Sequence, residues 1–357
     1  MPELTSITTP RWANMHGHLR QSDDEDKLMA DIMPHVYPHY YYYTAMPNTN
    51  PPKSTGEDCR NYYEEICSFV PREYKDLFFP ITPLKMLWDE NFKTSPEIIY
   101  RAKSLGINWV KLYFRGTTTN SDDGVLIEEL PQLFETLGKM EEYGMILLIH
   151  GEVPGKGINM DDREYLFANE HLPLLAEKFS KLKIVMEHIT DRRTVEIVKQ
   201  LPNTVAATIT THHLYISKND VLEPGPRPRN ACKPYAKQLE DLKAIQQAAF
   251  SGNPKFFFGD DNAWHRKWKK YGECGNCGCA HTHSVEFVTQ FFAEHGKLDL
   301  LENFACNYGP DFYGIKRPKG ELTIQKTEKP YFPEKELSDV LPWGFDIPLN
   351  WEVVKKI

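Results

Sequence analysis

The sequence predicts an α/β protein with a (β/α)8 barrel of the TIM type. Short apolar segments alternate with helical stretches along the chain, and eight such segments can be counted. Most of them are apolar at every position, which is typical of parallel strands covered on both faces. A length of 357 residues is normal for one barrel of this kind.

The predicted strands leave room for a helix between successive members. They are the segment that ends at residues 16–18, followed by 39–47, 77–84, 108–114, 145–151, 182–188, 204–213 and 255–261. The run Tyr40–Tyr43 within the second strand is unusual in sequence, but aromatic residues are ordinary in a buried strand. We therefore interpret this run as core packing.

Helical stretches with start and stop signals lie between and after these strands. They cover residues 22–33, 95–106, 126–144, 163–182, 192–201, 236–252 and 283–296. Ser95 and Pro96 open the second and Gly106 ends it, whereas Pro131 and Pro173 interrupt two others. No change in composition marks a second domain, so we expect one barrel over residues 1–317. The remainder, 318–357, is rich in Pro, Lys and Glu and is expected to be a C-terminal extension packed on the barrel or partly loose.

The composition excludes several classes of function. A net charge of −8 argues against a nucleic-acid-binding surface. No apolar run approaches the ~18 residues needed to span a bilayer, and the first residues contain no apolar signal core. Seven cysteines in 357 residues do not suggest a disulfide framework. We expect a cytoplasmic protein without a nucleic-acid or membrane partner.

Polar side chains occupy the ends of the predicted strands, where the chemistry of an α/β barrel takes place. These residues are His16, His18, Asn48, Lys111, His150, His188, Asp261 and, four positions further on, His265. Each one alone is more easily explained as a hydrogen-bonded structural residue. Burying all of them at one end without partners would cost several kcal/mol each, and a metal centre would supply the partners.

The residue types indicate which metal chemistry fits. Neutral imidazole and carboxylate ligands suit zinc and similar divalent ions. Two ions need a bridging anion, which a protonated lysine cannot provide. Reaction of Lys111 with carbon dioxide would convert it to a carbamate with two oxygens, so a lysine in the middle of a two-metal site is chemically reasonable.

The motifs HGHLR, MPN, VKLY followed by TTTNS, LLIHGE, MEHIT and GDDNAWH resemble those of dihydroorotase, specifically the shorter monofunctional type in the amidohydrolase superfamily. The resemblance runs from residue 14 to about 315 in matching order and spacing. It implies a metal-dependent barrel that interconverts dihydroorotate and N-carbamoyl-aspartate in pyrimidine synthesis.

The resemblance also implies roles for particular residues. His16, His18 and Asp261 would bind one zinc ion, His150 and His188 the second, and carbamylated Lys111 would bridge the two ions together with a hydroxide. Asp261 would act as general base and proton shuttle. The substrate would be contacted by Arg20, Asn48 and His265 at its carboxylate, by Thr118 and Thr119 on a mobile loop, and by the chain near Asn230 and Cys277. The implied partners are this small-molecule substrate and a second copy of the chain in a homodimer.

Two departures from the family pattern concern the surroundings of these residues. Asn14 stands where aspartate is usual, which removes no ligand but could weaken support around the metals. The turn after Asp261 reads Asn-Ala-Trp-His instead of Ser-Ala-Pro-His, and Trp264 could narrow the carboxylate pocket.

Two further motifs with cysteine or histidine are interpreted as structural. CGNCGC at 274–279, with His281 and His283 nearby, could form a structural zinc site or line the pocket through Cys277, but a glycine-rich turn is favoured. His213 is interpreted as a structural hydrogen-bonding residue.

Three functions were weighed. The first is dihydroorotase. The second is a hydantoinase- or allantoinase-like amidase for a neutral ring, against which Arg20, Asn48 and His265 argue. The third is a barrel retained only to bind another enzyme, which usually requires lost ligands, and none is lost here.

Overall fold

Ten parallel strand segments form the wall of the barrel in the computed structural model, which describes residues 4–21, 27–272 and 278–356. Two sheets share this wall, with strand orders β10-β9-β8-β7-β6-β5 and β11-β2-β3-β4. The strands are β2 (Trp12–His18), β3 (Tyr40–Ala45), β4 (Phe79–Ile81), β5 (Leu84–Met86), β6 (Trp109–Tyr113), β7 (Ile146–His150), β8 (Lys183–Met186), β9 (Val205–Ile209), β10 (Phe256–Phe258) and β11 (Asn262–Ala263).

The chain passes directly from one sheet to the other at two places. The third predicted strand, 77–84, is divided into β4, which pairs with β3, and β5, which pairs with β6. The eighth, 255–261, contains β10, which pairs with β9, and the chain then continues into β11, which lies beyond the predicted strand and pairs with β2. The backbone N–H of Asp261 donates to the carbonyl of His16 at 3.0 Å at this second junction. The predicted (β/α)8 fold is confirmed, with a wall broken at two strands.

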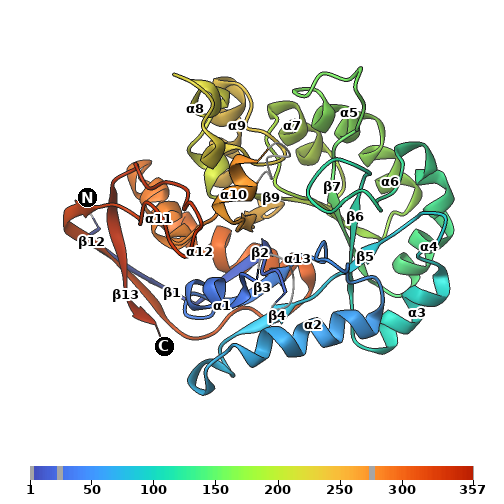
Figure 1. Cartoon of the computed structure of the whole chain (residues 1–357), viewed down its shortest axis with the longest axis horizontal. Coiled ribbons are helices and arrows are strands. Elements are labelled where there is room, and N and C mark those ends of the chain that lie inside the picture. Colours follow the sequence, from blue (N-terminus) through green and yellow to red (C-terminus); the bar gives the residue numbers. More distant parts are fainter. Residues whose placement is uncertain (1–3, 22–26, 273–277, 357) are drawn as a thin grey trace.

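Helices cover the outside of the wall (Figure 1). Those that follow the successive strands are α1 (Met29–Ile32), α2 (Gly56–Ser68), α3 (Pro96–Ser104), α4 (Phe134–Glu142), α5 (Arg163–Glu170), α6 (Leu172–Lys178), α7 (Arg192–Gln200), α9 (Leu239–Ala249) and α11 (Ser284–Glu294). Shorter helices are η1 (Met33–His35), η2 (Arg72–Tyr74), η3 (Ile127–Leu133), η4 (His212–Leu214), α8 (Lys218–Leu222), η5 (Pro228–Asn230), α10 (Lys267–Tyr271), α12 (Leu298–Glu302), η6 (Asn303–Asn307) and α13 (Tyr308–Tyr313).

Local sequence signals account for several helix limits. Ser95 caps α3 as expected, its side chain accepting from the N–H of Ile98. The stretch 126–144 is a 3₁₀ turn that contains Pro131, followed by α4, and 163–182 is divided before Pro173 into α5 and α6. Helix α2 was not predicted, although Thr55 and Asp58 form a capping box at its start.

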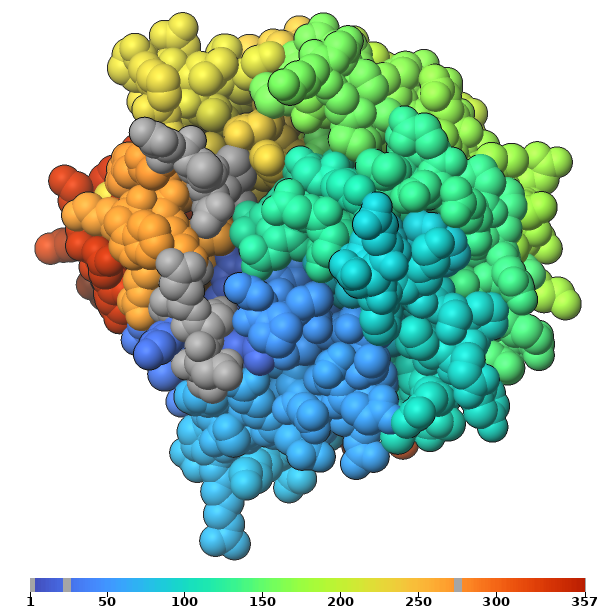
Figure 2. All heavy atoms as spheres, turned by 45° about the vertical axis from the view of Figure 1, so that its right-hand side comes forward, coloured from blue at the N-terminus to red at the C-terminus, as the bar shows by residue number. Residues whose placement is uncertain are grey.

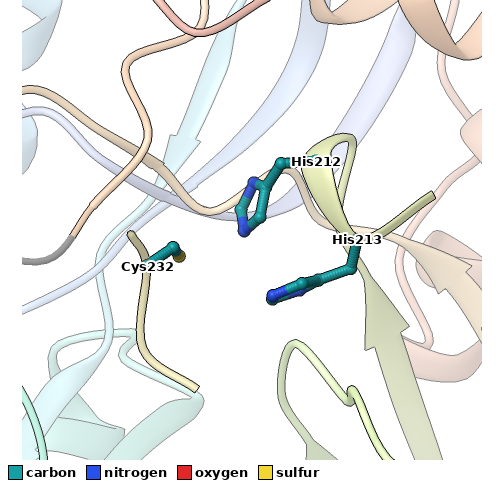
Figure 3. A group of neighbouring side chains, drawn as sticks. All are labelled: His212, His213 and Cys232. Carbon is teal, nitrogen blue, oxygen red and sulfur yellow. The ribbon is translucent and has the colours of Figure 1, made fainter. Parts of the chain in front are cut away.

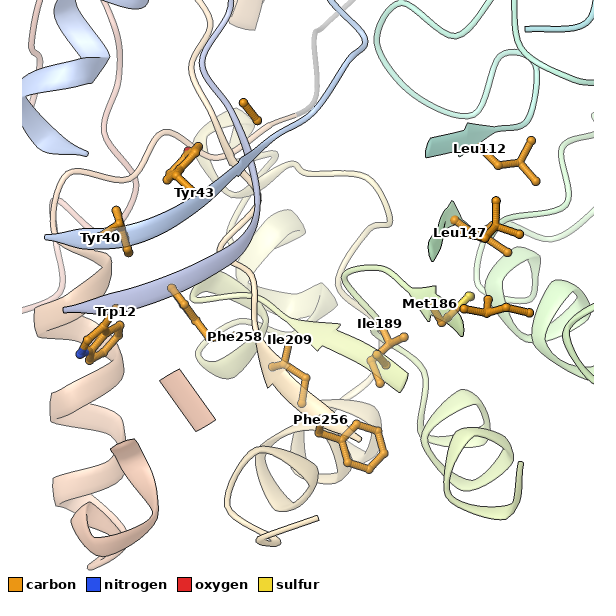
Figure 4. Close-up of a cluster of buried hydrophobic side chains, with 14 of the residues drawn as sticks. Trp12, Tyr40, Tyr43, Leu112, Leu147, Met186, Ile189, Ile209, Phe256 and Phe258 are labelled. Atoms are coloured by element: carbon orange, nitrogen blue, oxygen red, sulfur yellow. The ribbon is translucent and has the colours of Figure 1, made fainter. Parts of the chain in front are cut away.

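The core has an outer and an inner part. Side chains such as Leu112, Leu147 and Met186, from three neighbouring strands, are at most 1 % exposed and belong to the larger apolar cluster (Figure 4). Alternate residues on the same strands, such as Leu148 and Val185, form a separate buried cluster that includes Tyr313 from α13. The aromatic residues Tyr40 and Tyr43 are buried among apolar side chains, as the sequence predicted.

The tail after residue 318 contains two strands. β12 (Leu322–Tyr331) pairs antiparallel with both β1 (Ser6–Thr9) and β13 (Leu349–Lys356), so strands from the first and last parts of the chain share one sheet (Figure 1). Leu322, Ile324 and Trp351 are buried in the same cluster as barrel residues. The division of the chain at residue 317 stays a prediction. No helix among the described residues is long and apolar enough to cross a bilayer.

Candidate metal and substrate site

The side chains predicted to bind metal converge at the carboxyl end of the barrel. They come from β2 (His16, His18), β6 (Lys111), β7 (His150), the segment just after β8 (His188) and the junction of β10 and β11 (Asp261). Strand alternation places Lys111 on the same face as Trp109 and Tyr113, and His150 on the same face as Leu148. The pairing of β2 with β3 shifts register between Asn14 and Gly17, an irregularity of the kind that re-aims side chains.

Asp261 joins the two histidines of β2. Its Oδ1 lies 3.1 Å from Nε2 of His18 and 3.4 Å from Nε2 of His16. One ligand atom of each residue lies within 4.8 Å of the others, and all three are buried. Burial lowers the pKa of His18 to about 4, so this imidazole is neutral, as a metal ligand must be. The set fits a divalent ion with a preference for nitrogen and oxygen ligands.

His150 and His188 approach each other in the same pocket. Nδ1 of His150 lies 3.1 Å from Nε2 of His188. The amine of Lys111 is fully buried nearby and makes no hydrogen bond within the described part of the chain. Burial lowers the pKa of Lys111 to about 8. A buried amine without a partner is costly, so this position calls for a bound or bonded group.

Two glutamates that the sequence analysis did not single out support these histidines. Oε2 of Glu187 lies 2.9 Å from Nδ1 of His16, and Oε2 of Glu152 lies 2.8 Å from Nε2 of His150. A carboxylate on the far nitrogen fixes the tautomer of a ligating histidine. Both glutamates stand beside site histidines in HGE and MEH, and this adjacency was the available signal.

Three residues of the site have backbone conformations that non-glycine residues rarely adopt. The φ angles of Arg20, His188 and Asp261 are 65°, 43° and 47°. Such conformations cost of order 1–3 kcal/mol each and concentrate at functional sites, because they aim a side chain that a regular strand would direct elsewhere.

Arg20 lines the same pocket. Its Nε donates to the carbonyl of Trp264 at 3.0 Å, and its Nη2 lies 2.9 Å from Nε2 of His265. Burial and the charge of Arg20 hold the pKa of His265 well below its ordinary value, so this ring is neutral and accepts from the guanidinium. The expected narrowing by Trp264 is not seen. Its indole is fully buried in the apolar core beside His35, and only its carbonyl reaches Arg20.

A loop that follows β6 covers the pocket and is tied to Asn48. Nδ2 of Asn48 donates to the carbonyl of Thr119 at 3.0 Å, and Nδ2 of Asn120 donates to the carbonyl of Asn48 at 2.9 Å. The amine of Lys85 donates to the carbonyl of Asn120 at 2.7 Å and to Oδ1 of Asp123 at 2.5 Å. Figure 2 shows the teal-green segment around residue 120 against the blue segment around residue 50.

The resulting cavity is small. Its free volume is about 20 Å³, and its walls include His16, His18, Arg20, Asn48, Thr118, Thr119, His150, His188, Asp261 and His265. A volume of this size holds about one water molecule. A ring-sized ligand does not fit this volume in the present arrangement of the walls. Tyr113 and Lys233 also line the cavity and were missed by the sequence analysis.

The remaining candidates have other positions. Asn230 does not line the cavity, because its side chain donates to the carbonyl of Asp220 at 2.8 Å, and Lys233 reaches the wall instead. Cys277 lies outside the described residues. Both ring nitrogens of His213 have hydrogen-bonding partners, Thr210 at 2.9 Å and the carbonyl of Pro234 at 3.2 Å, which confirms its structural role.

Asn14 supports the site through its carbonyl oxygen. Oδ1 accepts from the backbone N–H of His16 at 3.2 Å and of Asp260 at 3.0 Å. The side chain thus joins the first and last strands of the barrel next to two site residues. An asparagine can accept these bonds as an aspartate would, so the support around the metal ligands is retained.

The known proteins most like this chain in the comparisons below are all dihydroorotases. A dihydroorotase from Teredinibacter turnerae is 37 % identical over 98 % of this chain and 99 % of its own, and one from Vibrio cholerae is 38 % identical over 96 % of each. The crystal structure of dihydroorotase in complex with 5-fluoroorotic acid from Saccharomyces cerevisiae superposes with a TM-score of 0.87 at 27 % identity, covering 98 % of this chain and 99 % of that one.

A more distant comparison shows the fold only. An L-hydantoinase from Arthrobacter aurescens has a TM-score of 0.79 but 14 % identity, over 99 % of this chain and 84 % of that one. No family model matches the chain.

Proposed function

The chain belongs to the dihydroorotase family, and from this membership we propose that it catalyses the reversible hydrolysis of the cyclic amide of L-dihydroorotate to N-carbamoyl-L-aspartate in pyrimidine biosynthesis. One observation carries the proposal beyond the family name. One cavity is lined by histidines, by Asp261 and by a buried arginine, Arg20. A cyclic amidase for a carboxylate-bearing ring needs both.

The family is metal-dependent, and the donor set fits two zinc ions. In this proposal His16, His18 and Asp261 would hold one ion, His150 and His188 would hold the other, and carbamylated Lys111 would bridge them. The lysine is suited to this role because its buried amine makes no hydrogen bond among the described residues, and because its lowered pKa favours the neutral amine that reacts with carbon dioxide. When bound, the ions would lower the pKa of water towards neutrality and polarise the ring carbonyl.

Asp261 is the group proposed to move the proton. Burial would raise its pKa, but hydrogen bonds from His16 and His18 hold the pKa well below its ordinary value, so it is ionised and can accept a proton from the attacking water. The same carboxyl then gives the proton to the ring nitrogen that leaves. In the reverse direction it removes that proton, which assists ring closure.

Arg20 is proposed to bind the substrate carboxylate together with His265 and Asn48. A guanidinium offers two parallel N–H donors that match a carboxylate. The carbonyl of Trp264 and the ring of His265 orient Arg20 before the ligand arrives. The yeast relative, solved with 5-fluoroorotic acid, supports an acidic ring ligand.

Thr118 and Thr119 are proposed to close over the bound substrate. Both line the cavity, on a loop held by Asn48 and Lys85. Closure would exclude bulk water from the reacting amide. The homodimer and the cytoplasmic location stay predictions from resemblance and composition.

The amidase for a neutral ring is the weaker alternative. The similarity to a hydantoinase concerns the fold alone, and a neutral ring would leave the charge of buried Arg20 without a counter-ion from the ligand.

The proposal is tested by the initial rate on L-dihydroorotate, followed by the loss of ring absorbance. Zinc-replete protein is compared with a chelated sample, and hydantoin serves as the neutral-ring control. Fast turnover of dihydroorotate that the chelator abolishes is expected. Turnover of hydantoin with none of dihydroorotate would overturn the proposal in favour of the alternative.

A further inference from the structure

Strand β9 supplies none of the proposed metal ligands, yet it reaches the centre of the site through Thr208. The two histidines that follow β9, His212 and His213, are not among the residues that line the cavity, and they point toward Cys232 instead (Figure 3). Thr208 is the residue before the last one of β9, and its side chain is fully buried. The contribution of this strand to the site therefore depends on one hydroxyl group.

Thr208 belongs to a polar layer inside the barrel. Val185 of β8 and Ala206 of β9 are members of the inner apolar cluster. Side chains alternate along a strand, so Glu187 and Thr208, each two residues further along, lie on the same inner face. Both side chains are at most 1 % exposed. The layer therefore separates the apolar interior of the barrel from the side chains proposed to bind metal.

The hydroxyl of Thr208 is both a donor and an acceptor. It donates to Oε2 of Glu187 at 2.6 Å and accepts from the backbone N–H of His188 at 2.7 Å. A hydroxyl has a single proton, and a backbone N–H can only donate. The proton of Thr208 is therefore directed to the carboxylate of Glu187, and no other arrangement satisfies both neighbours.

The two hydrogen bonds lead to one proposed ligand of each metal ion. Oε2 of Glu187, which accepts from the hydroxyl, also lies 2.9 Å from Nδ1 of His16. His188 has a φ of 43°, a conformation that a non-glycine residue keeps only where its surroundings hold it. The backbone N–H of Ile189 donates to the carbonyl of Thr208 at 3.1 Å. Thr208 thus engages two successive N–H groups at the turn that presents His188.

Packing fixes the direction of this hydroxyl. A Cβ atom at Gly259, just after β10, would lie 3.0 Å from Cγ2 of Thr208 and 2.9 Å from Cβ of His16. Because glycine has no side chain, the methyl of Thr208 and the side chain of His16 can both close against the backbone there. Threonine is stiff at χ1, so the place of its methyl group also sets the place of its hydroxyl.

We propose that Thr208 is a positioning residue for both metal ions, because its one hydroxyl orients Glu187 against His16 and holds the backbone that presents His188. The inference rests on the proposed function, since it assumes two ions in the barrel. Residues that contact metal ligands without touching the ion typically contribute roughly 10–100-fold in metal affinity. One hydroxyl serves a ligand of each ion here, so its removal should weaken the binding of both ions together.

The test compares Thr208→Val with Thr208→Ser in the full-length protein. Valine keeps the shape of threonine and removes the hydroxyl, whereas serine keeps the hydroxyl and removes the methyl group. Bound zinc per chain is measured against the free zinc concentration, which a chelator sets, with bicarbonate present. Thr208→Val should need a roughly 10–100-fold higher free zinc concentration to bind both ions, and Thr208→Ser should recover most of this loss. Equal losses in the two variants, or binding like that of the wild type in Thr208→Val, would overturn the proposal.

Thr44→Val is the matched control. Thr44 is also fully buried, and alternation with Tyr42 and Met46 of the inner cluster places it on the inner face of the barrel. Its hydroxyl has no hydrogen bond among the described residues, and it does not line the cavity. This variant should bind zinc like the wild type. A loss of zinc as large as that of Thr208→Val would show that any hydroxyl removed from the interior has this effect, and would overturn the proposal.

Glu187→Gln separates the two branches and does not require Thr208→Val to fold. It removes the carboxylate beside His16 and leaves the bond between Thr208 and the N–H of His188 in place. One of the two ions should therefore bind more weakly while the other keeps its affinity. Two ions bound as in the wild type would overturn the proposed branch through Glu187. Turnover of L-dihydroorotate by the wild type, measured in parallel, reports separately on the proposed function, because zinc binding is measured without substrate.

Discussion

Replacement of Arg20 by methionine should weaken substrate binding and leave the bound metal in place. Methionine keeps an unbranched apolar stem and removes all five N–H donors of the guanidinium. In the structure Nε donates to the carbonyl of Trp264 at 3.0 Å, and Nη2 lies 2.9 Å from Nε2 of His265. The other donors make no hydrogen bond among the described residues, so they can form the parallel pair that a carboxylate requires.

The size of the effect follows from that pair. A hydrogen bond to a charged group contributes ~1.5–3 kcal/mol, so two contribute at least about 3 kcal/mol. At 1.4 kcal/mol per factor of ten, this is a loss of roughly 150-fold in kcat/KM. The carboxylate does not react, so most of the loss should appear as a higher KM with a smaller change in kcat.

The assay is steady-state kinetics on L-dihydroorotate together with metal analysis of the same preparation. Arg11→Met is the matched control. Arg11 is also fully buried, but it donates to the carbonyls of Tyr37 and Tyr40 before the start of β2, away from the cavity. This control should lower the melting temperature and leave KM unchanged. An unchanged KM in Arg20→Met with full metal content would refute the role of Arg20.

Three further substitutions test other parts of the site. Lys111→Ala should lose one of the two proposed ions and nearly all turnover, and metal analysis that still finds two ions in the barrel would contradict its bridging role. Asp261→Ala should abolish turnover even in preparations that retain metal, and rates like those of the wild type would remove it from the mechanism. Lys85→Met should raise KM several-fold and speed amide hydrogen exchange in the 115–125 loop, because ~1.5–3 kcal/mol of charge-assisted hydrogen bonding to the loop is lost. Unchanged exchange would show that Lys85 does not hold the loop.

The barrel could be predicted because most of its strands are buried on both faces and therefore apolar throughout. The two divided strands could not, since the break between β4 and β5 depends on which neighbour each part pairs with, and pairing is not written in the composition of a strand. Helix α2 carried a readable capping box at Thr55 and was overlooked. The strands of the tail are half exposed and rich in charge, so their pattern did not distinguish them from a loose extension.

Some site residues can be recognised in the sequence and others only in the folded chain. Histidines at the ends of predicted strands can be recognised. Lys233 cannot, because it reaches the cavity from a segment without regular structure. Trp264 was expected in the pocket, but a large apolar ring is more stable in the core, and the backbone rotates so that only its carbonyl faces Arg20. The contact of Thr208 with the backbone of His188 likewise depends on tertiary structure.

Substrate binding depends on the opening of the loop over the cavity. A cavity of about 20 Å³ cannot admit a ring, so the hydrogen bonds of Asn48 to Thr119, of Asn120 to Asn48 and of Lys85 to Asn120 must break before substrate enters. At ~0.5–1.5 kcal/mol net for each of the two bonds between Asn48 and the loop and ~1.5–3 kcal/mol for the bond from charged Lys85, opening costs about 2.5–6 kcal/mol. The open form is then a minority of roughly one molecule in sixty to one in twenty thousand. In the closed form one N–H of the Asn48 side-chain amide donates to the carbonyl of Thr119, whereas its buried Oδ1 has no hydrogen bond among the described residues. Oδ1 cannot accept from a carboxylate, so Asn48 can contact the proposed substrate carboxylate only through the second N–H of Nδ2 while the first still holds the loop shut.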